Sequence, residues 1–114
     1  MKIGVDIGGT NVRAGRFLDN NLVQLSIEQN NTKTAKSTLI SIIACIKAVW
    51  NDDVRAIGVG SPGPLDYRTG TIIRTPNMPL RHFKLKDALD AEFRVPVVVD
   101  NDANCYALAQ YDSY

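Results

Sequence analysis

A carboxylate, two glycines and a hydroxyl follow one another near the start of the chain, in Asp6-Ile7-Gly8-Gly9-Thr10-Asn11. Glycine has no Cβ, so its main-chain N–H groups can approach an anion closely, and the Thr10 hydroxyl adds a donor. Such a turn suits the phosphates of a nucleotide. Asp6 would then face their Mg²⁺ through water, because magnesium keeps much of its hydration shell. An ordinary Gly-Gly hairpin turn explains the hexapeptide equally well.

A second glycine-rich segment, Gly58-Val59-Gly60-Ser61-Pro62-Gly63, matches the dinucleotide-binding pattern G-x-G-x-x-G directly after a predicted strand. That pattern needs a helix to begin within the glycines, whereas Pro62 and Pro64 exclude one. We therefore reject dinucleotide binding and expect a rigid loop at the C-terminal end of a strand, where open α/β sheets place ligand crevices. The loop either presents the Gly63 backbone to a ligand or is a structural bend.

Two aspartates and two asparagines fall within five positions in Asp100-Asn101-Asp102-Ala103-Asn104, directly after a predicted buried strand. One aspartate is explained as the N-cap of the next helix, but the remaining polar side chains exceed that need. A carboxylate at a strand end can accept the proton of a hydroxyl, while neighbouring amides hold other hydroxyls with paired donor and acceptor atoms. The segment is typical of sugar recognition.

A lesser polar feature is Thr75-Pro76-Asn77. Asn77 is either a further ligand for a hydroxyl or simply a turn residue. Taken alone, the tripeptide favours the turn, because Pro and Asn are both common turn residues.

The apolar spacing predicts the elements that carry these segments. Strands at residues 2–6, 11–18 and 22–27 are expected to form an antiparallel meander. A helix is expected from residue 35 to about residue 50, because its apolar residues recur at helical spacing: Leu39, Ile42, Ile43, Ile46 and Val49. The buried strand that follows, at residues 54–59, should run parallel to an earlier strand, since a crossover helix joins them.

The second half of the chain predicts a loop at residues 61–70 and a short edge strand at 71–73, followed by a turn at 75–79. A helix at residues 85–93, a buried strand at 95–99 and a helix from 103 to about 110 complete the order. The predicted fold class is α/β, a mixed sheet with the order βββαβ(β)αβα whose parallel part is covered by helices.

Composition limits the classes of protein that fit. With 114 residues, 45% hydrophobic, the chain is long enough for one core but too short for a complete two-lobed enzyme. A net charge of +1 without a basic run argues against nucleic acid as a partner, and no apolar stretch is long enough to span a membrane. We expect a cytoplasmic protein. Cys45 and Cys105 lack the spacing of a zinc site, and both are expected to be buried apolar residues.

The candidate segments, in this order, resemble the ROK family of sugar kinases and related repressors. The resemblance rests on Asp6 to Thr10, Gly58 to Pro64, Thr75-Pro76-Asn77, and Pro96 to Val99 running into Asn101-Asp102-Ala103-Asn104. The resemblance covers the chain from Met1 to about Ala109. The resemblance implies a ribonuclease H-like, actin-like ATPase lobe.

The resemblance also implies roles for individual residues. ATP and Mg²⁺ would be bound by Asp6, Gly8, Gly9, Thr10 and Asn11, with Asp6 towards the metal. Asp102 would be the general base that activates a hexose hydroxyl. The residues expected to contact the sugar are Gly63, Asn77, Asn101 and Asp102.

Departures from the family pattern leave alternatives open. ROK kinases have a second lobe with a cysteine-rich zinc motif, and this chain leaves the pattern after Ala109. Its start directly at a strand, without a preceding DNA-binding motif, favours the kinase branch. We expect the N-terminal lobe of an ATP-dependent hexose kinase that forms a homodimer through the helix after residue 103. The alternatives are a sugar-sensing module of repressor type and a non-catalytic remnant.

Overall fold

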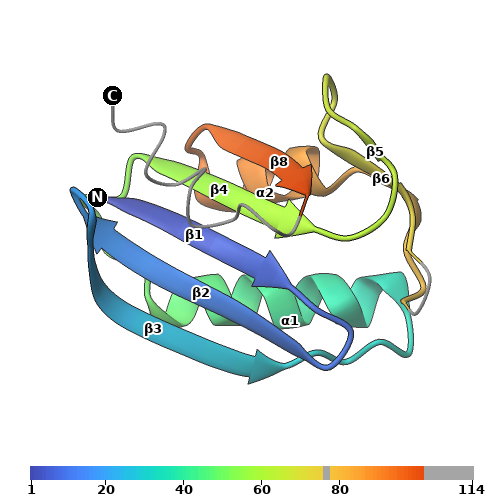
Figure 1. Ribbon diagram of the computed structural model, residues 1–114, viewed down its shortest axis with the longest axis horizontal. Helices are drawn as coiled ribbons and strands as arrows, with labels where there is room; N and C mark the ends of the chain where they lie inside the picture. Colours follow the sequence, from blue (N-terminus) through green and yellow to red (C-terminus); the bar gives the residue numbers. More distant parts are fainter. Residues whose placement is uncertain (76–77, 102–114) are drawn as a thin grey trace.

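The computed structural model describes residues 1–75 and 78–101 (Figure 1). The elements in these ranges are β1 (Lys2–Ile7), β2 (Asn11–Leu18), β3 (Asn21–Gln29), α1 (Ala35–Ala48), β4 (Ala56–Ser61), β5 (Leu65–Asp66), β6 (Thr71–Arg74), β7 (Arg81–Phe83), α2 (Leu85–Phe93) and β8 (Val97–Asn101). The helix predicted from residue 103 lies outside the described residues.

The main sheet has the strand order β3-β2-β1-β4-β8. β1, β2 and β3 pair antiparallel, as the predicted meander requires. β4 is parallel to β1, and β8 is parallel to β4, so the prediction of a parallel pair joined by a crossover helix is confirmed. The arrows of β1, β4 and β8 point the same way in Figure 1, and these three strands therefore end at one edge of the sheet.

The strand predicted at residues 71–73 is confirmed as β6, but its predicted place at a sheet edge was wrong. β5, β6 and β7 form a separate three-stranded antiparallel sheet, and β6 is its middle strand. β5 and β7 span two and three residues, too few to show a period of two in the sequence. Gly70, at φ +64°, permits the turn between β5 and β6.

β4 and β8 each begin two residues later than predicted. Val54 is buried, but its N–H donates to Asn51 O, so this residue belongs to the turn after α1. Val95 likewise packs against the core before β8 begins. An apolar residue at the end of a turn can therefore be counted as strand when only its hydropathy is considered.

α1 begins with reciprocal hydrogen bonds between Thr34 and Ser37. The Ser37 N–H donates to Thr34 Oγ1 at 2.9 Å, and the Thr34 N–H donates to Ser37 Oγ at 3.0 Å. At the other end, the Arg16 guanidinium donates to Val49 O at 2.8 Å, where the helix dipole favours a positive charge. Both ends of the helix are therefore fixed to the structure around them.

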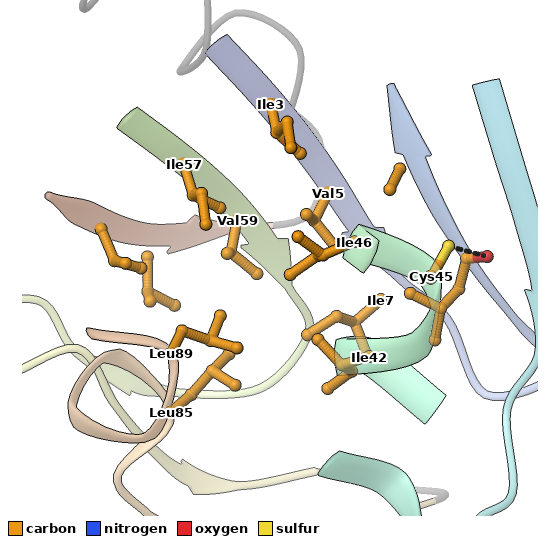
Figure 2. Close-up of a cluster of buried hydrophobic side chains, with 14 of the residues drawn as sticks. Ile3, Val5, Ile7, Ile42, Cys45, Ile46, Ile57, Val59, Leu85 and Leu89 are labelled. Atoms are coloured by element: carbon orange, nitrogen blue, oxygen red, sulfur yellow. Dashed lines mark hydrogen bonds between the residues drawn. The ribbon is translucent and has the colours of Figure 1, made fainter. Parts of the chain in front are cut away.

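Both helices cover the same face of the main sheet (Figure 2). Residues of β1 and β4 meet side chains of α1 and α2 in one cluster, which includes Ile3, Val5, Ile7, Ile42, Ile46, Ile57, Val59, Leu85 and Leu89. The rings of Trp50 and Phe93, 5.1 Å apart, join the C-terminal ends of the two helices. This packing fixes the strands whose ends carry the candidate site.

Cys45 is fully buried, so its prediction as a buried residue is confirmed, whereas Cys105 lies outside the described residues. The Cys45 Sγ lies 3.3 Å from Val12 O and 3.4 Å from Ser26 O.

In the part of the chain that the structure describes, no helix has the length and apolar character needed to cross a bilayer.

Candidate functional site

The three parallel strands bring the predicted site segments to one edge of the sheet. Asp6 of β1 is in register with Gly60 of β4, and Gly60 is in register with Asp100 of β8. One residue further, Ser61 pairs with Asn101. The turn after β1 and the loop after β4 therefore start beside the end of β8, at the edge where open α/β sheets place ligand crevices.

The turn between β1 and β2 is closed by a hydrogen bond from the Gly8 N–H to Asn11 O, at 2.9 Å. A Cβ added to Gly8 would lie 3.0 Å from Asn11 O, whereas a Cβ added to Gly9 would have no atom within 4 Å. Gly9 and Thr10 are both exposed. The open space at Gly9 fits the approach of a phosphate group, which a side chain there would occupy.

Asp6 is half-buried where β1 ends, and it interacts with other residues of the protein. Among the described residues, no three or more His, Cys, Asp or Glu side chains gather into a metal-ligating group. A divalent ion bound by the Asp6 carboxylate would complete its coordination with phosphate oxygens and water. This fits Mg²⁺, which commonly binds through one or two carboxylates, substrate phosphates and water.

Asn30, which the sequence analysis did not select, holds the Gly-Gly turn from a neighbouring segment. Its Nδ2 donates to Gly8 O at 2.7 Å, and its main-chain N–H donates to Thr10 O at 2.8 Å. Its side chain is buried, with 6% of its surface exposed. In the sequence, Asn30 is marked only by its position directly after β3, the strand that pairs with β2. That position alone does not indicate its hydrogen bond with Gly8 O.

The last residue of β3 and the four that follow it line an open pocket of about 360 Å³ beside this turn: Gln29, Asn30, Asn31, Thr32 and Lys33. The pocket lies in the connection between β3 and α1. Its lining is mainly amide, hydroxyl and ammonium groups, which suit a polar ligand.

Position 63 requires a glycine, because of its backbone conformation and its close contact with the end of β6. Its φ is +95°, and a Cβ there would overlap Arg74 O and lie 3.5 Å from Thr75 Cγ2. The Ile73 N–H also donates to Pro64 O at 3.0 Å. The loop after β4 is thus packed closely against the end of β6, so the structural reading of Gly63 has direct support.

A further contact joins the end of β6 to the Gly-Gly turn. Thr75 Oγ1 donates to Met78 O at 2.8 Å, and Met78 Sδ lies 3.4 Å from Asn30 Nδ2. The Met78 and Asn30 side chains therefore connect Thr75, in a segment predicted to contact a sugar, with the Gly-Gly turn, which is predicted to contact phosphate. Asn77 itself lies outside the described residues.

Asp102 also lies outside the described residues, and of Asn101 only the backbone, paired with Ser61, is described. The predicted roles of Asn77, Asn101 and Asp102 therefore stay predictions. β8 ends at the same edge of the sheet as β1 and β4.

The rejection of dinucleotide binding is supported by the course of the chain after β4. Gly58 and Gly60 lie within β4, and the chain continues from Gly63 into β5 rather than into a helix. No helix N-terminus is available at these glycines to receive a pyrophosphate.

Comparison with known proteins gives a consistent result. The ROK family model matches residues 2–113. The glucokinase of Streptomyces coelicolor is 34% identical over 113 residues, which cover 97% of this chain and 35% of that protein. The N-acetyl-D-glucosamine kinase of Aliivibrio fischeri is 35% identical over 116 residues, covering 96% of this chain and 37% of that protein.

The fold has a close counterpart among solved structures. The ROK family glucokinase from Streptomyces griseus, in complex with glucose and AMPPNP, superimposes with a TM-score of 0.81 at 36% identity, covering 90% of this chain and 33% of that one. This agreement confirms the predicted α/β class of the ribonuclease H-like, actin-like ATPase type. The chain spans about a third of the length of the curated relatives it matches.

Proposed function

The chain belongs to the ROK family, and from this premise we propose that it is the N-terminal lobe, residues 1–114, of an ATP-dependent kinase for a hexose or hexose derivative. The observation that carries the proposal is the meeting of the Gly-Gly turn, open at Gly9, with the ends of β4 and β8 at one edge of the sheet. The names of the similar glucokinase and N-acetyl-D-glucosamine kinase support the substrate class.

In this proposal the residues of the turn bind the nucleotide. The main chain of Gly8 and Gly9, the Thr10 hydroxyl and Asn11 hold the phosphates, and Asp6 orients a hydrated Mg²⁺. ATP, when bound with its magnesium, supplies the phosphoryl group and part of the charge neutralisation. The contribution of these residues is positioning, which dominates catalysis of phosphoryl transfer.

The sugar would be held by residues of the loops at the same edge. The backbone of Gly63 and the amides of Asn77 and Asn101 contact its hydroxyl groups, and Asp102 accepts the proton of the attacking hydroxyl, most often the 6-hydroxyl. A carboxylate in that role orients the hydroxyl as well as taking its proton.

We further propose that the complete protein acts in the cytoplasm, where ATP and Mg²⁺ are available, and that it is a homodimer. The helix predicted to form the dimer contact lies outside the described residues. Exposed apolar side chains on β3 provide additional apolar surface: Leu22, Val23, Leu25 and Ile27.

The test is ADP release by the complete protein with a panel of hexoses. Asp102→Asn should lower kcat by several powers of ten and change the sugar Kd far less, because the amide keeps the shape but cannot take a proton. Asp52→Asn, at an exposed turn after α1, is the matched control and should leave both constants unchanged.

Two results would contradict the proposal. A kcat near the wild-type value in Asp102→Asn would remove Asp102 as the base. Sugar binding by the wild-type protein without any ADP release would instead support the sugar-sensing module.

A further inference from the structure

We propose that Asn30 is a positioning residue for nucleotide phosphates: its amide holds the Gly8 carbonyl and thereby directs the Gly9 N–H towards the phosphate. The inference rests on the proposed kinase function and adds to it a residue outside the Gly-Gly turn. Asn30 lies twenty-two positions from Gly8 in the sequence and contacts it directly.

Two hydrogen bonds hold the turn from the same residue. Asn30 Nδ2 lies 2.7 Å from Gly8 O, and the Asn30 N–H lies 2.8 Å from Thr10 O. The second bond continues the pairing of β2 with β3 beyond their ends, so it fixes where Asn30 sits. The first bond depends on the side chain and can be removed by substitution.

The bond to Gly8 O determines where the Gly9 N–H points. The peptide that joins Gly8 to Gly9 is trans, because the described residues contain no cis peptide bond. In a trans peptide the C=O and the following N–H point in opposite directions. Because Gly8 O faces Asn30, the Gly9 N–H faces away from it.

The Gly9 N–H is available to a ligand. Among the described residues it has no hydrogen-bond partner, and the space next to the Gly9 Cα is open. A main-chain N–H that is fixed in direction and unpaired is the kind of donor that binds phosphate oxygens. A free peptide at this glycine could rotate, since glycine tolerates many backbone conformations, and the donor would then be lost.

The surroundings of the Asn30 amide show that its nitrogen, and not its oxygen, makes the contact with the turn. Asn30 Oδ1 is buried and has no hydrogen-bond partner among the described residues. A buried acceptor without a partner is unfavourable, so an apolar side chain would suit this position better if only packing mattered. Exchanging the amide's oxygen and nitrogen would place an oxygen against Gly8 O, so the observed orientation is the one that provides a donor.

Asn30→Asp is the direct test in the complete protein. The carboxylate has the size of the amide but no donor, and it repels Gly8 O, so the peptide is no longer held. We expect the Kd of a non-hydrolysable ATP analogue, measured by calorimetry, to rise roughly tenfold, the change that corresponds to one lost hydrogen bond. The KM for ATP should rise with it, while the sugar Kd stays within about twofold.

Asn51→Asp is the matched control. It adds the same charge in the turn after α1, outside the pocket and the Gly-Gly turn, where its Oδ1 accepts from the Asp53 N–H, a role that a carboxylate keeps. ATP-analogue binding should therefore stay close to wild type. Asn30→Ala removes the donor without adding charge, and it provides the same test if Asn30→Asp does not fold.

The outcomes separate a positioning role from a structural one. Wild-type affinity for the ATP analogue in both Asn30 variants would overturn the inference. Equal losses of analogue and sugar binding, together with a lower Tm, would mean that Asn30 only stabilises the fold, and would overturn it as well. If the wild-type protein binds no ATP analogue, the proposed function fails, and the inference fails with it.

Discussion

Asp6 and Asp100 lie in one register row of the main sheet, one on each side of Gly60. Neighbouring strands are about 4.8 Å apart, so the two Cα atoms are separated by about 10 Å. Side chains alternate along a strand, and the adjacent Val5, Ile7 and Val99 pack into the core under the helices. Both carboxylates therefore project from the opposite face, with no side chain between them on β4.

This arrangement gives a prediction for the metal. Asp6→Asn in the complete protein should raise the Mg²⁺ concentration needed for half-maximal activity by about tenfold, because a neutral amide attracts a hydrated cation much less than a carboxylate does. Binding of an ATP analogue without Mg²⁺ should change little. Titration of activity against Mg²⁺ checks this, with Asp19→Asn, in the exposed turn between β2 and β3, as the control. An unchanged Mg²⁺ requirement would exclude Asp6 as the residue that orients the metal.

The open space at Gly9 gives a second prediction. Gly9→Val should fold normally, because a Cβ at this position has no atom within 4 Å. Its side chain should occupy the space that a phosphate needs, so the Kd for ATP should rise by at least tenfold while the sugar Kd stays near wild type. Calorimetry with each ligand measures both. Equal losses of the two ligands would indicate a damaged fold instead of a blocked phosphate site.

A side chain at Gly63, unlike one at Gly9, should lower the stability of the fold. Gly63→Ala places a side chain at φ +95° and against Arg74 O, so it should lower the free energy of unfolding by about 2 to 4 kcal/mol. Gly9→Ala is the matched control, and its change should be within about 0.5 kcal/mol. Chemical denaturation of the two variants gives the comparison. Similar stabilities would show that the loop after β4 can move away from β6 without cost.

The sequence was sufficient to predict the strands and helices whose side chains alternate or recur over several turns. β1, β2 and α2 lie within one residue of their predicted bounds because each presents one apolar face to the core. β3 lies within two residues of its predicted bounds although its apolar side chains are exposed. The sequence also predicted that β4 runs parallel to an earlier strand, since a crossover helix precedes it. The convergence of the turn after β1 with the ends of β4 and β8 comes from the observed pairing of these strands.

Other features depend on contacts between distant segments and leave no local signal. β7 has three residues and is a strand because it pairs with β6, through Ile72 with Phe83 and Arg74 with Arg81. Asn30 resembles any polar loop residue until the pairing of β3 with β2 brings it to Gly8. Gly63 was recognised as part of a loop, but the reason for glycine there is the backbone of Arg74, eleven positions later.

Cys45 provides the last prediction, a dependence of stability on pH. Burial raises the pKa of its thiol, and the hydrogen bond with Ser26 only partly opposes this effect. The folded protein therefore binds the thiol proton more tightly than the unfolded chain does. The stabilisation is complete below the pKa of the unfolded thiol, about 8.5, and is lost as the pH rises through the higher pKa of the folded state.

We therefore expect the free energy of unfolding to fall above about pH 8.5 by up to about 1.4 kcal/mol per pH unit from this group. Cys45→Ala should be less stable at neutral pH, because it loses buried contacts, but its stability should fall less steeply between pH 8 and pH 10. Chemical denaturation of both proteins across this range isolates the thiol, since their other titrating groups are shared. Parallel curves would mean that the Cys45 thiol ionises equally well in the folded and unfolded states, despite its burial beside Val12 O.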